Sequence, residues 1–290
     1  MTGPRHGADA RLRGLALNTA TLGHNLEGRG AGWPVERVID ACAARGLGGI
    51  VFWRREIGAR AAEIGERVRG AGMEVTGLCR APYLAGPLAL PSRDAIMDDF
   101  RAAIDMAAAL GTKVLTIVTG GVEPGTRGIA PTLELIADRV AEAAPLAAAC
   151  GVSLALEPLH PVYAGDRAAL VTMRDAVDLC DRIGAPNVGV ACDVYHVWWD
   201  RTLPAELARA GCARILGFHL CDWLADTRDV LLDRGMMGDG VADLAAIGRA
   251  VRAAGFAGCA EVEVFSARNW WLRPPDEVLD VMVERFLALG

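Results

Sequence analysis

The chain has 290 residues, of which 52% are hydrophobic and 23% charged, and its net charge is −6. This length fits a single α/β barrel of roughly 250 residues, and the negative charge disfavours partners such as nucleic acid or an anionic membrane, which usually require a basic face. Residues 1–14 lack the apolar core of a signal peptide, and no later apolar run is long enough to span a bilayer. We therefore expect a cytoplasmic protein whose partner is a small molecule.

Strands and helices are predicted to alternate along the whole chain. The predicted strands are residues 12–17, 49–52, 73–78, 113–118, 152–157, 187–192, 214–218 and 259–265. The predicted helices are residues 34–45, a segment ending near residue 70, and residues 94–110, 131–150, 167–183, 204–211, 241–254 and 275–289. This order predicts an α/β fold, a (β/α)8 TIM barrel formed by residues 12–290 as a single domain, preceded by a flexible segment at residues 1–11.

A doubly wound sheet would give a similar alternation of strands and helices. Such a sheet usually carries a G-x-G-x-x-G turn after its first strand, and this sequence has none there. Its most distinctive acidic residues instead follow one another at strand ends in the second half of the chain. Both observations favour the barrel.

Four consecutive predicted strands in the second half of the chain end on a metal-ligating residue type. These residues are Glu157, Asp193, His219 and Glu263. In a parallel barrel all strand ends of this kind meet at one rim, so the four side chains should surround a single point. A single Glu or His at a strand end is as readily explained by a salt bridge or solvation, but four at equivalent positions predict a metal site. Three carboxylates and an imidazole suit Mn²⁺, the ion we expect, with Mg²⁺, Co²⁺ or Zn²⁺ as alternatives.

Two glutamates occur on the last predicted strand, Glu261 and Glu263. Because side chains on a strand alternate between its faces, the two point to the same side. Glu263 is nearer the rim and is the predicted ligand. Glu261 lies one layer deeper and is interpreted as a structural acid or a residue that supports a ligand.

Further residues near the rim are candidates for contact with a substrate. His196 follows Asp193 closely and could contact substrate or orient a ligand. Arg234 lies in a long Gly-rich connection, residues 221–240, and Trp53 and Trp199 follow strand ends, where aromatic planes could bind the apolar faces of a sugar. For each of them, a role in a surface loop, in the core or at an interface is an equally good explanation. The oligomeric state stays open.

The eight cysteines are scattered without a C-x-x-C pair, which argues against a zinc ribbon and against a disulfide framework. Most are interpreted as small buried apolar residues. Cys192 and Cys221 lie close to candidate metal ligands, so a catalytic thiol stays as an alternative for these two.

Several motifs together resemble one family. They are EPLHPVY from Glu157, CDVYHVWWD around Asp193, GFHLCDW around His219, DRGMMGDG in the long connection and EVEVFS around Glu263. They are similar to those of the sugar phosphate isomerase/epimerase family, the xylose-isomerase-like TIM barrels, most closely over residues 150–275. One departure is that an arginine close behind the histidine ligand, as ketose epimerases have, is missing.

The resemblance implies a divalent metal held by Glu157, Asp193, His219 and Glu263, with His196 helping to bind substrate oxygens. It also implies that the two glutamates exchange protons beside a carbonyl. The predicted activity is therefore a metal-dependent isomerase or epimerase acting on a sugar, keto-sugar or cyclitol through an enediolate next to a metal-bound carbonyl. The alternative is a lyase similar to inosose dehydratase, which would use the same enolate.

Two other classes of function are less well supported. A phosphoesterase related to the endonucleases of this barrel type would need more histidines than the five present and a basic surface for DNA. A catalytically silent sugar-binding barrel would be supported if Glu157→Gln and Glu263→Gln both retained full biological activity with metal still bound. Whether the substrate is phosphorylated stays open, because arginines occur near the predicted rim loops but no Gly-rich phosphate-binding loop is evident.

Overall fold

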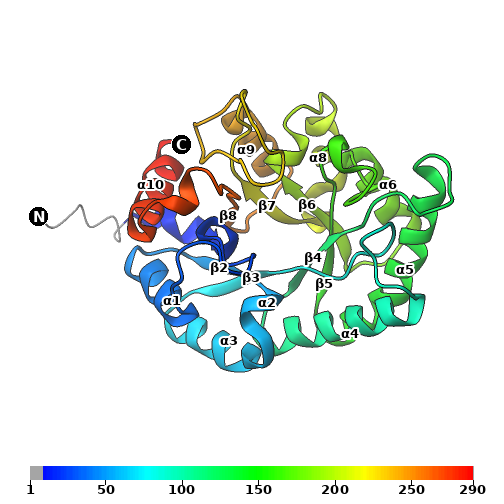
Figure 1. The fold of residues 1–290 in the computed structure, drawn as a ribbon, viewed down its shortest axis with the longest axis horizontal. Coiled ribbons are helices and arrows are strands. Elements are labelled where there is room, and N and C mark those ends of the chain that lie inside the picture. Colours follow the sequence, from blue (N-terminus) through cyan, green and yellow to red (C-terminus); the bar gives the residue numbers. More distant parts are fainter. Residues whose placement is uncertain (1–8, 290) are drawn as a thin grey trace, which may run out of the picture.

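A computed structural model describes residues 9–289, which form a closed barrel of eight parallel strands in the order β1 to β8 (Figure 1). The strands are β1 (Leu15–Asn18), β2 (Gly49–Trp53), β3 (Glu74–Cys79), β4 (Val114–Val118), β5 (Ser153–Glu157), β6 (Val188–Asp193), β7 (Ile215–Leu220) and β8 (Ala260–Val262). The predicted (β/α)8 barrel is confirmed. Most of the segment predicted to be flexible, residues 1–11, lies outside the described residues.

Helices surround the barrel, and Figure 1 shows them as an outer ring. They are α1 (Val35–Ala44), α2 (Arg54–Ile57), α3 (Ala61–Gly70), α4 (Arg93–Leu110), α5 (Ala130–Ala149), α6 (Met173–Ile183), α7 (Val194–Val197), α8 (Leu203–Arg214), α9 (Leu244–Ala253) and α10 (Pro275–Ala288). The short 3₁₀ helices are η2 (Ala10–Gly14), η3 (Thr19–Leu22), η4 (Gly58–Arg60), η5 (Pro161–Tyr163) and η6 (Trp270–Leu272). None of the helices within residues 9–289 has both the length and the hydrophobicity needed to cross a membrane.

Local sequence signals explain where the helices begin and end. The hydroxyl of Ser92 accepts the backbone N–H of Ala95 at the start of α4, and Gly111 adopts a left-handed conformation (φ 84°) at its end.

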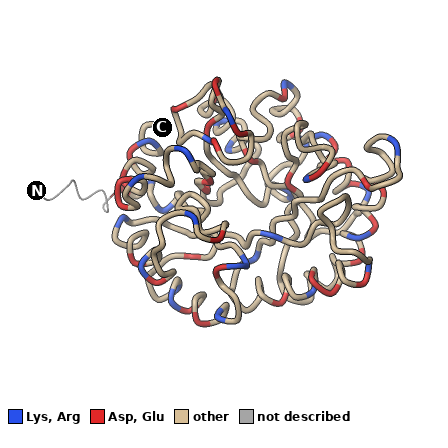
Figure 2. The backbone as a smooth tube through the Cα atoms, viewed as in Figure 1, with Lys and Arg blue, Asp and Glu red and all other residues tan. Residues whose placement is uncertain are grey.

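The ring of helices closes where Arg45, at the end of α1, forms ion pairs with Asp276 and Asp280 of α10. Figure 2 shows acidic and basic residues interspersed around this outer ring.

The barrel register places the chemically important strand ends side by side. Asp193 on β6 lies opposite His219 on β7, and His219 lies opposite Glu261 on β8. Because parallel strands all end at the same rim, these side chains are neighbours as soon as the barrel closes.

The last strand is shorter than the sequence predicts, and the hydroxyl of Thr21 explains the difference. This hydroxyl donates to the carbonyl oxygen of Val262 and accepts the backbone N–H of Val264, at 2.8 and 2.9 Å. The side chain thus takes the place of a neighbouring strand, and β8 ends at Val262 rather than at residue 265. Glu263 consequently lies immediately beyond the strand.

Candidate metal centre and cavity

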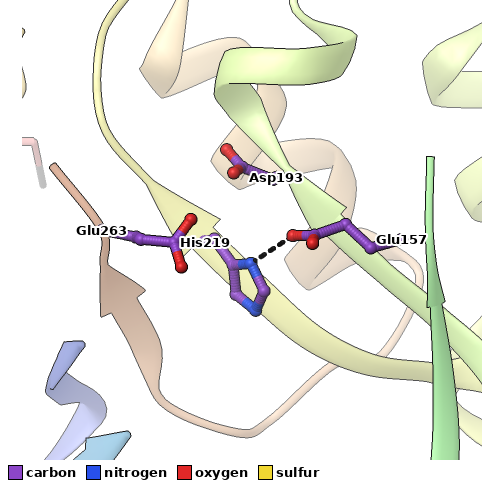
Figure 3. A group of neighbouring side chains, drawn as sticks. All are labelled: Glu157, Asp193, His219 and Glu263. Atoms are coloured by element: carbon purple, nitrogen blue, oxygen red, sulfur yellow. Dashed lines mark hydrogen bonds and ion pairs between the residues drawn. The ribbon is translucent and has the colours of Figure 1, made fainter. Parts of the chain in front are cut away.

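The four predicted metal ligands meet at the rim of the barrel (Figure 3). One ligand atom from each of Glu157, Asp193, His219 and Glu263 lies within 4.8 Å of all the others, and all four residues are buried. Glu157 and Asp193 are the last residues of β5 and β6, His219 lies on β7, and Glu263 follows β8. Figure 3 shows Glu157 and Glu263 on either side of the His219 ring. We refer to these four residues as the acidic group.

The imidazole of His219 is oriented by a glutamate on each of its nitrogen atoms. Its Nδ1 lies 2.8 Å from Oε1 of Glu157, and its Nε2 lies 3.1 Å from Oε2 of Glu261. Burial disfavours the charged ring, but the hydrogen bonds to Glu157 and Glu261 outweigh burial and raise the pKa of His219 well above its usual value. Gly217 makes room for this ring, because a Cβ there would lie 3.1 Å from Nε2. The bond from Nε2 to Glu261 leaves Nδ1 as the nitrogen that faces the acidic group.

Arg234 enters the acidic group from the long connection after β7. Its Nη1 lies 3.0 Å from both Oδ2 of Asp193 and Oε2 of Glu263. The guanidinium carbon also lies 4.4 Å from the ring centre of Tyr195 and 4.3 Å from that of Phe265. Arg234 is therefore fixed by two carboxylates and two aromatic faces. It brings an arginine to the carboxylates of the acidic group although none follows His219 closely in the sequence.

The connection that carries Arg234 is held in place by the buried carboxylate of Asp222. Its Oδ2 accepts the backbone N–H groups of Gly238 and Gly240, at 3.0 and 2.9 Å, and its Oδ1 accepts those of Trp223 and Ala242, at 2.9 and 3.1 Å. Backbone hydrogen bonds between Asp222 and Gly235 add to this anchor. A charged acceptor with four N–H donors fixes a segment that has no helix or strand of its own.

Charge within the acidic group is not balanced by Arg234 alone. Burial raises the pKa of Glu263 to about 8, and the carboxylates of Glu157 and Asp193 add to the rise, although Arg234 opposes it. For Asp193, burial acts in the same direction, but Arg234, His196 and His219 outweigh it and lower the pKa of that carboxyl. Three carboxylates and one imidazole form a donor set that suits a divalent cation, and such an ion would offset the remaining negative charge. The acidic group therefore fits the predicted metal.

A cavity of about 540 Å³ opens over the acidic group. Glu157, Glu263, Arg234 and His196 line it, and so does the predicted substrate-binding residue Trp53. This volume suits a small organic ligand.

The buried ring of His196 is neutral in this cavity. Burial lowers the pKa of His196 to about 3, so the ring is neutral at ordinary pH. Its Nδ1 accepts the backbone N–H of His160 at 3.2 Å. Its Nε2 lies 3.3 Å from Nη2 of Arg234, which can only donate, and 3.6 Å from Oδ2 of Asp193. The neutral ring of His196 therefore lies between the cavity, Arg234 and the acidic group.

The tryptophans near the rim occupy different positions. Trp53 lines the cavity, and its Nε1 donates to Oδ1 of Asn18 at 2.9 Å. Trp199 lies behind His196, to whose carbonyl oxygen its Nε1 donates at 2.8 Å, and it is not among the residues that line the cavity. Trp270 and Trp271 are buried, so they do not form an exposed surface.

Three residues in or near the cavity were not predicted from the sequence. Asn18, the last residue of β1, donates from Nδ2 to Oε1 of Glu263 at 2.8 Å and links that carboxylate to Trp53. Arg167 and Tyr83 line the cavity from loops. Asn18 could have been noticed as a polar residue at a predicted strand end. Arg167 was predicted to begin a helix, whereas α6 begins at Met173, and no sequence signal distinguishes Tyr83 from an ordinary loop residue.

Comparisons with known proteins agree with this architecture. The sequence model of the family described as xylose isomerase-like TIM barrel matches residues 39–286. Protein SMc04130 from Sinorhizobium meliloti 1021 is 45% identical, with a TM-score of 0.88 over 96% of this chain and 98% of that chain. No curated protein sequence matches the chain.

Two more distant structures share the fold. The IolI protein, whose structure contains a zinc atom, is 18% identical with a TM-score of 0.79 over 95% of this chain and 97% of that chain. A D-psicose 3-epimerase, solved in the presence of D-fructose, is 17% identical with a TM-score of 0.70 over 95% of this chain and 99% of that chain.

Proposed function

Because the chain belongs to the xylose isomerase-like TIM-barrel family, we propose that it is a divalent-metal-dependent isomerase or epimerase of a sugar, keto-sugar or cyclitol. The observation that carries this proposal is the buried meeting of Glu157, Asp193, His219 and Glu263 beneath a cavity of small-molecule size. A sugar epimerase, the D-psicose 3-epimerase, shares the fold, which supports the substrate class.

The four residues of the acidic group would hold the ion, with Mn²⁺ as our first choice. When bound there, a divalent cation supplies a Lewis acid that polarises a carbonyl and offsets negative charge developing beside it. The carboxylates of Glu157 and Glu263 move the protons. One of them takes the proton from the carbon next to the carbonyl, and the other returns a proton to the opposite face or to the neighbouring carbon. The first outcome is epimerisation and the second is isomerisation.

The surrounding residues bind and orient the substrate in this proposal. The imidazole of His196 forms a hydrogen bond with a substrate hydroxyl group, and Trp199 positions His196 through its bond to the backbone. Trp53 and Phe265, whose ring centres lie 5.8 Å apart, provide an apolar wall for the carbon skeleton. Arg234 holds the carboxylates of Asp193 and Glu263 in place and adds positive charge near the reacting oxygens.

Solvent deuterium exchange tests this proposal. A screen of keto-sugars and cyclitols in D₂O with Mn²⁺-loaded protein should identify a compound that gains deuterium without losing any part of its skeleton. Glu157→Gln and Glu263→Gln should each slow that exchange by about 10²- to 10⁴-fold, because an amide cannot act as a base. Glu206→Gln is the matched control, since Glu206 is a buried glutamate on α8 that pairs with Arg174 and Arg209.

Other results would change the assignment. Release of water from the labelled compound would identify the lyase that uses the same chemistry. Full exchange in both glutamine variants would contradict the proposed roles of Glu157 and Glu263, and wild-type protein that is active without any divalent metal would contradict the metal dependence.

A further inference from the structure

The cavity is rich in arginine although the chain as a whole carries a net charge of −6. The basic residues that line it are Arg54, Arg55, Arg80, Arg167 and Arg234, and the acidic ones are Asp99, Glu157 and Glu263. Two of these three acids belong to the acidic group. The rest of the cavity therefore has more positive than negative charge, which is unexpected in a site for a neutral sugar.

Three of these arginines have carboxylate partners. Arg54 forms two hydrogen bonds with Asp99, at 2.7 and 2.9 Å. Arg55 lies 3.2 Å from the exposed Glu27. Arg234 is bound by the acidic group, as described above.

Arg80 and Arg167 lack a comparable partner, and both contact Tyr83. The guanidinium carbon of Arg80 lies 3.6 Å from the centre of the Tyr83 ring, and Nη1 of Arg167 donates to the Tyr83 hydroxyl at 3.3 Å. Within residues 9–289, no acidic side chain forms an ion pair with Arg80, whose Nη1 donates to the carbonyl oxygen of Ala81. Among the acidic residues that the structure describes, Arg167 forms an ion pair only with the half-exposed Asp166, at a long distance of 3.8 Å.

The environment of Arg80 is unfavourable for a positive charge. Burial lowers its pKa, and the nearby charges of Arg167 and Arg54 lower it further. Arg80 and Arg167 thus carry like charges, and both contact the neutral side chain of Tyr83 inside the cavity. This arrangement is expected of an anion-binding site.

We propose that Arg80 and Arg167 bind an oxyanion of the substrate, a carboxylate or a phosphate, while its hydroxyl and carbonyl oxygens face the acidic group. This inference rests on the proposed function and narrows it from sugars in general to a sugar acid or a sugar phosphate. A planar guanidinium matches the geometry of both oxyanions, and the hydroxyl of Tyr83 holds Arg167 in position.

Binding of three matched polyols tests the inference without any need for turnover. D-glucitol, D-gluconate and D-glucitol 6-phosphate have the same carbon number and differ in one end group. Isothermal titration should be carried out on Mn²⁺-loaded protein and again after chelation. Wild-type protein should bind at least one of the anions about tenfold or more tightly than D-glucitol, in line with the strength of a charge-assisted hydrogen bond. The preferred anion then distinguishes carboxylate from phosphate.

Variants connect that preference to the two arginines. Arg80→Gln and Arg167→Gln should each reduce the anion preference by about tenfold and leave binding of D-glucitol within about twofold. Arg80→Lys should keep part of the preference, because it retains the charge but loses the planar fork. Arg69→Gln is the matched control, since Arg69 on α3 is an arginine outside the cavity that hydrogen-bonds a backbone carbonyl oxygen. Thermal melts show whether each variant is folded.

The outcomes separate the two proposals. The inference is overturned if no polyol binds wild-type protein, if D-glucitol binds as tightly as both anions, or if Arg80→Gln changes anion binding no more than Arg69→Gln does. The preference for an anion over D-glucitol should persist after chelation. It can therefore be measured even if the protein turns out not to need a metal.

Discussion

The site combines two kinds of support, one from strands and one from loops. Asp193 and His219 are on neighbouring strands, and the barrel register places them opposite each other. Arg234 is on the connection between β7 and α9, where the carboxylate of Asp222 and pairing with neighbouring segments hold the backbone. A loop residue and a strand residue are in direct contact here, because Nη1 of Arg234 lies 3.0 Å from Oδ2 of Asp193.

The difference shows which parts of the site depend on one another. A residue on a strand is positioned by many backbone hydrogen bonds shared with the whole barrel, so a local change in a loop should leave it in place. A residue on a loop depends on a few side-chain anchors and should move when one of them is lost. Metal affinity should therefore respond strongly to changes on the strands and weakly to changes in the loop.

The largest effect is expected from Asp193→Asn. This variant removes a charged ligand from a strand end and leaves Arg234 with one carboxylate partner fewer. Loss of a residue that merely supports a ligand typically weakens metal binding 10- to 100-fold, so loss of the ligand itself should weaken Mn²⁺ binding by roughly 100-fold or more. Electron paramagnetic resonance titration of free Mn²⁺ measures this. Asp138→Asn, a change at an exposed position on α5, serves as the control, and equal affinity in the two variants would remove Asp193 from the ligand set.

A smaller effect is expected from Glu261→Gln. The amide oxygen can still accept a hydrogen bond from Nε2 of His219, but it no longer increases the basicity of the ring as a carboxylate does. We expect Mn²⁺ affinity to fall by about 10- to 100-fold while the fold is retained. The same titration together with a thermal melt checks both points. An affinity within about twofold of wild type would show that Glu261 is a structural residue with no influence on the metal.

The strand-borne half of the site could be predicted from the sequence because strand ends are visible in it. Apolar runs that close on Glu157, Asp193 and His219 mark the rim, and the parallel topology brings them together without further information. Alternation along the strand puts Glu261 and Glu263 on the same side, and Glu263 was chosen as the ligand because it is nearer the rim. The structure agrees with both expectations about position, since Glu261 contacts His219 and Glu263 joins the acidic group.

The loop-borne half could not be predicted because its geometry depends on contacts between segments far apart in the sequence. Tyr83 and Arg167 meet across separate loops, and the end of β8 is set by the hydroxyl of Thr21, near the other end of the chain. Arg234 was identified as a candidate, but its partners depend on how Asp222 folds the Gly-rich connection. These contacts follow no periodic pattern that a sequence would reveal.

The smallest effect on metal binding is expected from Asp222→Asn, which removes the loop anchor and leaves the strands untouched. The amide offers one acceptor oxygen where the carboxylate offered two, so some of the four backbone N–H groups lose their partner. The free energy of unfolding should fall by about 2–3 kcal/mol, which corresponds to a decrease in Tm of roughly 4–12 °C. Mn²⁺ affinity should change by less than about tenfold, because the ligands lie on other elements. Asp226→Asn, an exposed change in the same connection, should alter neither value. A loss of affinity as large as that of Glu261→Gln would show that the loop and the strands form one cooperative unit, and Arg234 would then act as part of the metal site rather than as a separately supported neighbour.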